Sequence, residues 1–148
     1  MTVDGLPLHP LVIHATVVAL LLLAIGSVAY LRPRWQAALR WPLAALAVAS
    51  AVLVWFTGAT GDSLKHDRFA TATGVLAQRI HHHEDLAGKL ALATYLLAGV
   101  ALVLTVLRGR LSGRLARIGS APLAVGAVAV VVLCVLTGDA GARAAWGQ

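Results

Sequence analysis

Residues 10–31 read PLVIHATVVALLLLAIGSVAYL, and no charged side chain interrupts them. A helix needs roughly 20 apolar residues to cross the roughly 30 Å of hydrocarbon in a bilayer. This stretch therefore predicts a membrane-spanning helix. It does not fit a cleavable signal peptide, because nothing basic precedes Arg32 and its apolar run exceeds the roughly 7–15 residues of such signals.

Three further apolar blocks follow the first one. Across the chain 59% of residues are hydrophobic and 12% are charged, whereas soluble domains have about 25% charged residues. A soluble helical bundle is therefore the disfavoured alternative. In hydrocarbon a spanning backbone must satisfy its own hydrogen bonds, so each block is expected to be helical. The sequence predicts an all-α integral membrane four-helix bundle, with residues 1–148 as one transmembrane domain. The expected helices are 10–31, 42–57, 73–107 (86–107 in the membrane) and 119–137.

The charged residues are unevenly distributed between the connections. The first connection holds Arg32, Arg34 and Arg40, and neither it nor the third connection contains an acid or a histidine. Basic residues in short loops mark the cytoplasmic face, so both termini are predicted to lie on the extracytoplasmic side. Topology and anionic lipid explain the net charge of +6 without nucleic acid, and the expected partner is the lipid bilayer. The third connection holds Arg108, Arg110, Arg114 and Arg117.

An internal repeat becomes visible when the sequence is shifted by 80 residues. Residues 42–61 (PLAALAVASAVLVWFTGATG) then match residues 122–141 (PLAVGAVAVVVLCVLTGDAG) at 11 of 20 positions. We expect two helical hairpins of the same orientation, related by an axis along the membrane normal. Each even helix would start at its proline and end at Thr-Gly. The small residues Ala45, Ala49 and Gly126 would let helices two and four pack closely near the centre.

Three histidines are candidates for a cofactor site. His14 lies inside the first span, where an ionisable residue is a functional candidate by default, and His9 precedes it at the helix start. From Thr73 a stripe with steps of three and four residues includes His83, which then faces the packing side of the third helix. Histidines from opposing helices of a bundle can ligate haem b or a divalent metal. Counted by depth, His83 lies level with His9, and His14 lies about 10 Å away at 1.5 Å per residue.

A second cluster suits a zinc or copper ion. It consists of His81, His82, Glu84 and Asp85, and successive histidines on a helix point in different directions. A solvated helix face is the favoured interpretation of His81 and His82. Asp62 and Asp139 are further metal candidates, although tightening of the preceding Thr-Gly turn is favoured for both. Cys134 is interpreted as a packing residue, because the chain has one cysteine and no Cys-x-x-Cys motif.

Several motifs together resemble a known family. They are the opening Leu6-x-Leu8-His9-Pro10-Leu11-x-x-His14, the pair His83-Glu84 before the third helix, and the closing run from Thr137 to Ala142. The whole chain resembles a bacterial family of four-helix membrane proteins of unknown function, domain of unknown function 2231. The resemblance implies a multi-pass protein of the bacterial inner membrane, with His9, His14 and His83 at histidine positions of the family. At Asp139 the family often has a histidine, so this chain departs from the pattern there.

Three classes of function stay open at this point. The first is a haem b or metal-binding protein for electron transfer, with an outward-facing site. The second is a structural or accessory subunit whose histidines only pack and form hydrogen bonds. The third is a channel or carrier for a small solute, which at four spans would need to form a homo-oligomer or join a larger membrane complex. An enzyme is least favoured, since the sequence shows no nucleophile arrangement or acid–base pair.

Overall fold

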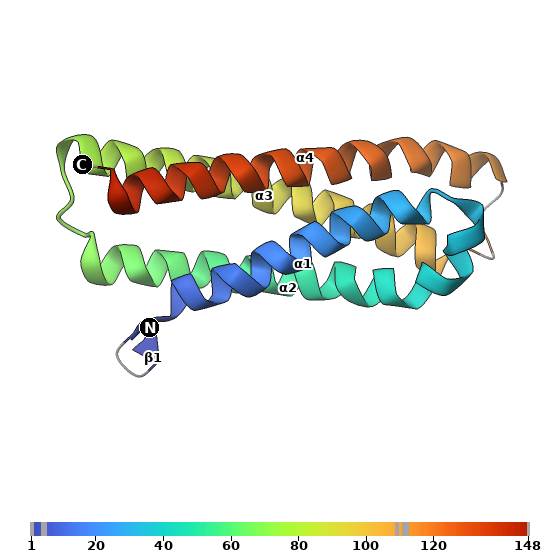
Figure 1. Ribbon diagram of the computed structural model, residues 1–148, viewed down its shortest axis with the longest axis horizontal. Coiled ribbons are helices and arrows are strands. Elements are labelled where there is room, and N and C mark those ends of the chain that lie inside the picture. Colours follow the sequence, from blue (N-terminus) through green and yellow to red (C-terminus); the bar gives the residue numbers. More distant parts are fainter. Residues whose placement is uncertain (1, 4–5, 109, 111–112, 148) are drawn as a thin grey trace.

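The computed structural model describes residues 2–3, 6–108, 110 and 113–147, and in this part of the chain four antiparallel helices form a bundle (Figure 1). A two-residue antiparallel ribbon precedes them, formed by β1 (Thr2–Val3) and β2 (Leu6–Pro7). A short 3₁₀ turn, η1 (Pro33–Trp35), connects the first two helices. The helices are α1 (Leu8–Tyr30), α2 (Gln36–Arg68), α3 (Gly74–Val106) and α4 (Gly113–Trp146).

Each of the four helices is long and apolar enough to span a membrane. This confirms the prediction of an all-helical, multi-pass membrane bundle. At about 1.5 Å per residue, the 23 residues of α1 roughly match the hydrocarbon thickness of about 30 Å. The 33 residues of α2 and of α3 extend well beyond it.

The helices form a closed square, in which α1 packs on α2 and α4, and α3 also packs on α2 and α4. Both termini lie at the same end of the bundle as the connection between α2 and α3 (Figure 1). We call this the histidine end. The opposite end carries the α1–α2 and α3–α4 connections, and we call it the arginine end. The contact pattern is unchanged when α1 is exchanged with α3 and α2 with α4, as expected for two repeated hairpins.

The core alternates leucines with small side chains. Leu23 and Leu97 are fully buried beside Ala47 and Ala101. In each hairpin a glycine lets a leucine of the partner helix pack closely: Leu43 packs against Gly26, and Leu97 packs against Gly126. Because lipid is as apolar as leucine, such close packing is what holds helices together in a membrane. Large aliphatic side chains such as Val48 and Val125 are exposed on the outside of the bundle, where lipid would cover them.

The expected close packing of α2 on α4 is wrong. These two helices lie diagonally and make few contacts within the described residues. Ala45 and Ala49 are exposed on the outer surface, and Gly126 packs against Leu97 of α3. Composition identified small residues correctly, but it gave no information on which face of the helix they occupy.

The even helices also differ from expectation at both ends. Pro42 and Pro122 lie inside α2 and α4, about two turns after the helices begin. Neither Thr-Gly pair ends a helix, because α2 continues to Arg68 and α4 to Trp146. Among the described glycines only Gly74 has a positive φ, at 62°, so the Thr-Gly glycines are helical and do not adopt the left-handed cap conformation. A proline near a helix start costs one backbone hydrogen bond, which membrane helices tolerate.

Candidate histidine site

His9 binds the second helix of its own hairpin. It is the second residue of α1, and its Nδ1 lies 3.1 Å from the carbonyl oxygen of Thr57 and 3.2 Å from Oγ1 of Thr60 on α2. The Thr60 hydroxyl itself donates to the Thr57 carbonyl at 3.0 Å. The edge of the imidazole ring rests against Gly61, where a Cβ would lie 3.1 Å from Cε1 of His9. Glycine at this position therefore leaves room for the ring.

His83 makes the same contact in the second hairpin. Its Nδ1 lies 3.0 Å from the carbonyl oxygen of Thr137 on α4, and a Cβ at Gly141 would lie 3.0 Å from its Cε1. Thr137 and Gly141 are the repeat partners of Thr57 and Gly61, at the shift of 80 residues. The two hairpins thus build one local structure twice, with a histidine of the odd helix held against a Thr carbonyl and a glycine of the even helix.

The carbonyl contacts determine which ring nitrogen carries a proton. A carbonyl oxygen can only accept a hydrogen bond, so Nδ1 must donate in both His9 and His83. In a neutral ring the lone pair is then on Nε2. No described group forms a hydrogen bond with Nε2 of either ring. A backbone carbonyl on Nδ1 with Nε2 left for the ligand is the arrangement that orients metal-binding histidines.

The two halves of the site differ in their hydroxyl groups. In the first hairpin Thr57 Oγ1 donates to the Leu53 carbonyl at 2.7 Å and lies 2.6 Å from Thr16 Oγ1. In the second hairpin Thr137 is 8% exposed, and its Oγ1 has no hydrogen-bond partner within the part of the chain described. The repeat position of Thr60 is Ala140, which is buried. The second half therefore has an unpaired hydroxyl beside His83.

His14 is not brought to this site. Its side chain is exposed, and its Nδ1 lies 2.7 Å from the Pro10 carbonyl one turn earlier in the same helix. It therefore lies on the outside of the bundle.

His9 and His83 are close enough for their charges to interact, and the carboxylate of Asp62 also acts on His9.

The second histidine cluster lies on the solvated surface of the histidine end. His81 and His82 are exposed, and so is Asp85. Glu84 forms a salt bridge to Lys65 of α2 at 2.7 Å, with His81 at 3.6 Å. Because Lys65 already neutralises Glu84, this carboxylate joins α2 to α3 across their connection.

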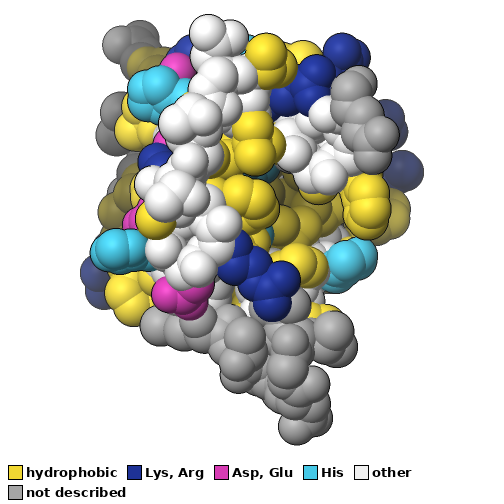
Figure 2. Space-filling view, turned by 90° about the vertical axis from the view of Figure 1, so that its left-hand side faces the viewer, with side chains coloured by type: hydrophobic (Ala, Val, Ile, Leu, Met, Phe, Trp, Pro, Cys, Tyr) yellow, Lys and Arg dark blue, Asp and Glu magenta, His cyan; other side chains and the backbone are white. Residues whose placement is uncertain are grey.

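Neither Asp62 nor Asp139 forms a hydrogen bond or an ion pair with either ring in the described part of the chain. Asp62 is exposed, and Asp139 pairs with Arg143 at 2.8 Å, one turn further along α4. No three His, Cys, Asp or Glu side chains of the described residues are grouped closely enough to hold a metal ion. In Figure 2, which looks onto the histidine end, the histidine, acidic and basic side chains are scattered among hydrophobic ones.

The sequence repeat already marks the segments that contact the two histidines, but it does not show that they do so. The repeat aligns Thr57-Gly58 and Gly61 with Thr137-Gly138 and Gly141, and from the sequence alone these segments are predicted to be helix ends. Their role is instead to receive the rings. The backbone carbonyls were not foreseeable as partners, because every residue has one.

The fold and the paired histidines define a multi-pass membrane protein built from two repeated hairpins. The chain belongs to the family of predicted membrane proteins designated DUF2231, whose family model matches residues 5–148. Neither a curated protein nor a solved structure matches it. The resemblance seen in the sequence motifs is thereby confirmed.

Proposed function

We propose that His9 and His83 ligate the iron of haem b and that the protein carries electrons at the histidine end of the bundle. The observation that carries this proposal is the duplicated contact of Nδ1 with a Thr carbonyl, at 3.1 Å for His9 and 3.0 Å for His83. It leaves Nε2 of both rings without a protein partner, on helices α1 and α3 at one end of the molecule.

Haem suits this donor set better than a bare metal ion does. Structural zinc is held by four protein ligands and catalytic zinc by three, and no group of three ligands exists in the described residues. A haem iron brings four nitrogen ligands of its own and needs only axial ones from the protein.

An accessory subunit without a cofactor is the second candidate. It is favoured by the way each ring joins the two helices of its own hairpin, since such a contact stabilises the bundle with nothing bound. The channel or carrier hypothesis requires a homo-oligomer or a larger complex, since the core of the single chain is filled by leucines such as Leu20, Leu23 and Leu97.

The test is the absorption spectrum and elemental metal content of the full chain, produced with haem, zinc and copper supplied and purified in mild detergent. We expect a Soret band in the wild type that is lost in His9→Ala and in His83→Ala. His14→Ala is the matched control, because it removes a histidine of the same helix whose ring lies outside the bundle. It should leave the band unchanged.

Three results would overturn the haem proposal. Stoichiometric zinc or copper without colour would replace it with a metal site. Neither haem nor metal in well-folded protein would favour the accessory subunit. Loss of the band in His14→Ala together with retention in His83→Ala would show that the ligands were wrongly assigned.

A further inference from the structure

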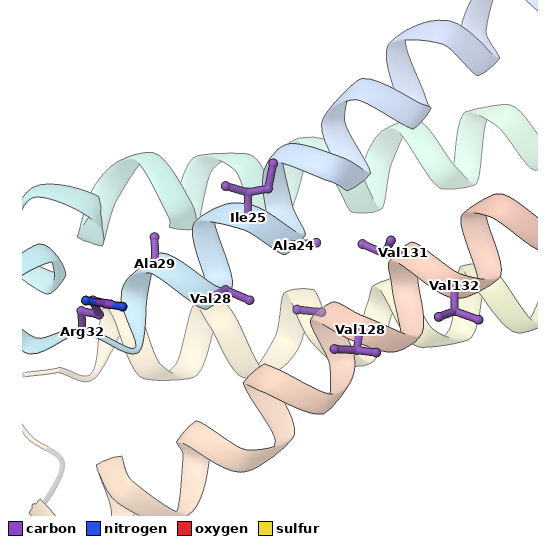
Figure 3. A pocket seen from close by; sticks show the side chains of 9 residues that line it. Ala24, Ile25, Val28, Ala29, Arg32, Val128, Val131 and Val132 are labelled. Carbon is purple, nitrogen blue, oxygen red and sulfur yellow. The ribbon is translucent and has the colours of Figure 1, made fainter.

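A groove of about 490 Å³ opens on the outside of the bundle between α1 and α4 (Figure 3). Its walls are aliphatic and come from two membrane-spanning helices. Among the described residues that line it, the one charged side chain is Arg32, which follows the last turn of α1 and lies at one end of the groove (Figure 3). The other lining residues include Ile25, Val28, Val128, Val131 and Val132.

The internal repeat explains why the groove opens at this seam. The α1–α4 seam is the counterpart of the α2–α3 seam, and there Arg40 of α2 reaches across to α3. Its Nε donates to the Thr105 carbonyl at 3.0 Å and its Nη2 to the Val106 carbonyl at 3.1 Å. At the shift of 80 residues the counterpart of Arg40 is Ser120, whose side chain is much shorter. The α1–α4 seam therefore has no arginine at the position from which Arg40 reaches α3.

Arg32 itself has no partner among the described residues. The acidic residues of the described part of the chain lie late in α2, early in α3 or late in α4, so no described acid lies at the arginine end. Arg40 differs, because the carbonyls of α3 occupy its guanidinium. An unpaired guanidinium placed just beyond the end of a span, next to an apolar groove within the span, matches an amphiphile with an anionic head.

We propose that this groove binds an anionic phospholipid, with its phosphate at Arg32 and one acyl chain along the valines of α4. The charge of Arg32 selects the headgroup, and the groove accommodates the chain. The volume lies within the range of about 300–1,000 Å³ that is usual for small-molecule sites. The site lies away from the histidine end and does not depend on the haem proposal.

Native mass spectrometry of the full chain released from detergent tests the site. The probes are phosphatidylglycerol and phosphatidylcholine with identical acyl chains. We expect the wild type to retain phosphatidylglycerol preferentially. Arg32→Gln should lower that retention about fivefold, the effect of removing one basic residue near an anionic headgroup. Arg34→Gln is the matched control, because it removes the same charge from an exposed residue of the same end that does not line the groove.

A second variant tests the apolar part of the groove. Ala29→Leu fills the groove from α1 and should reduce retention of both lipids, whereas Arg32→Gln should affect phosphatidylglycerol alone. Equal retention of the two lipids by the wild type, or equal losses in Arg34→Gln and Arg32→Gln, would overturn the proposal. So would disulfide-linked dimers of Val128→Cys in a Cys134→Ala background in nanodiscs, since a second copy of the chain would then cover the groove.

Discussion

The two hairpins share a contact but not its surroundings. In both, a histidine of the odd helix donates from Nδ1 to a threonine carbonyl and rests against a glycine. Only the first hairpin surrounds the contact with paired hydroxyls, whereas the second has Ala140 in place of Thr60 and an unpaired Thr137 hydroxyl. The difference indicates that the ring, carbonyl and glycine form the essential unit, and that the hydroxyls belong to one half alone.

The largest expected effect on stability comes from disrupting the unit of ring, carbonyl and glycine in both hairpins. In Gly61→Leu and Gly141→Leu the new Cβ would lie 3.1 and 3.0 Å from a histidine Cε1, so the Cβ alone forces the ring to shift by a few tenths of an ångström. Overpacking of this kind costs about 1–3 kcal/mol. The measurement is the thermal midpoint of unfolding in detergent.

Matched controls for these two variants are available one turn earlier. Gly58→Leu and Gly138→Leu introduce the same side chain where nothing lies within 4 Å of the new Cβ, and both glycines are exposed. These variants should leave the midpoint unchanged or raise it. Equal destabilisation in all four would show that leucine is harmful for a reason other than displacement of the rings.

Replacing the threonine beside each histidine with valine should have an intermediate effect on stability, and the effect should have opposite signs in the two hairpins. Thr137→Val removes a buried hydroxyl without a partner, and leaving such a group unpaired costs about 1–3 kcal/mol, so this variant is expected to be more stable than the wild type. Thr57→Val removes a hydroxyl that is bonded at 2.7 Å and should lose about 0.5–1.5 kcal/mol. Unfolding in detergent measures both. Destabilisation by Thr137→Val would mean that its hydroxyl binds a water molecule or a ligand.

The smallest expected effect on stability comes from replacing Thr60 with alanine, the residue at its repeat position in the second hairpin. Thr60→Ala removes a hydroxyl that contacts His9 Nδ1 at 3.2 Å and should cost about 0.6 kcal/mol, the mean for side-chain hydrogen bonds in membrane helices. Combined with His9→Ala, its effect on unfolding should be non-additive by about 0.5 kcal/mol or more. Combined with His83→Ala, the effect of Thr60→Ala on stability should be additive. Equal coupling of Thr60→Ala to both histidines would contradict the view that the Thr60 hydroxyl acts on His9 alone.

The architecture was readable from the sequence because its determinants are local. Uninterrupted apolar stretches such as 10–31 are dictated by hydrocarbon thickness, and the proline and glycine positions revealed the repeat. Helix ends were less predictable. Proline is a strong helix breaker in water and glycine a weaker one, yet Pro42 and the Thr57-Gly58 pair both lie within α2. In a long bundle, continued packing against a neighbouring helix outweighs these local preferences.

The site was only partly predictable for a related reason. Counting residues placed His83 level with His9, and the structure gives both the same contact. The same count could not tell that His14 faces outward, because a helix that is apolar all round carries no periodic signal of its buried face. The groove at Arg32 was hidden as well, since it depends on Ser120 being shorter than Arg40 at a seam between distant segments.

The repeat has a consequence for how such a chain could arise. Both hairpins run in the same direction, and the contacts of the square are preserved when one hairpin is exchanged for the other. Joining two copies of a single hairpin end to end would produce this arrangement. A symmetric dimer of one-hairpin chains would already contain both histidines, each held within its own copy. Fusion then frees the halves to diverge, as the exchange of Thr60 for Ala140 and of Arg40 for Ser120 illustrates.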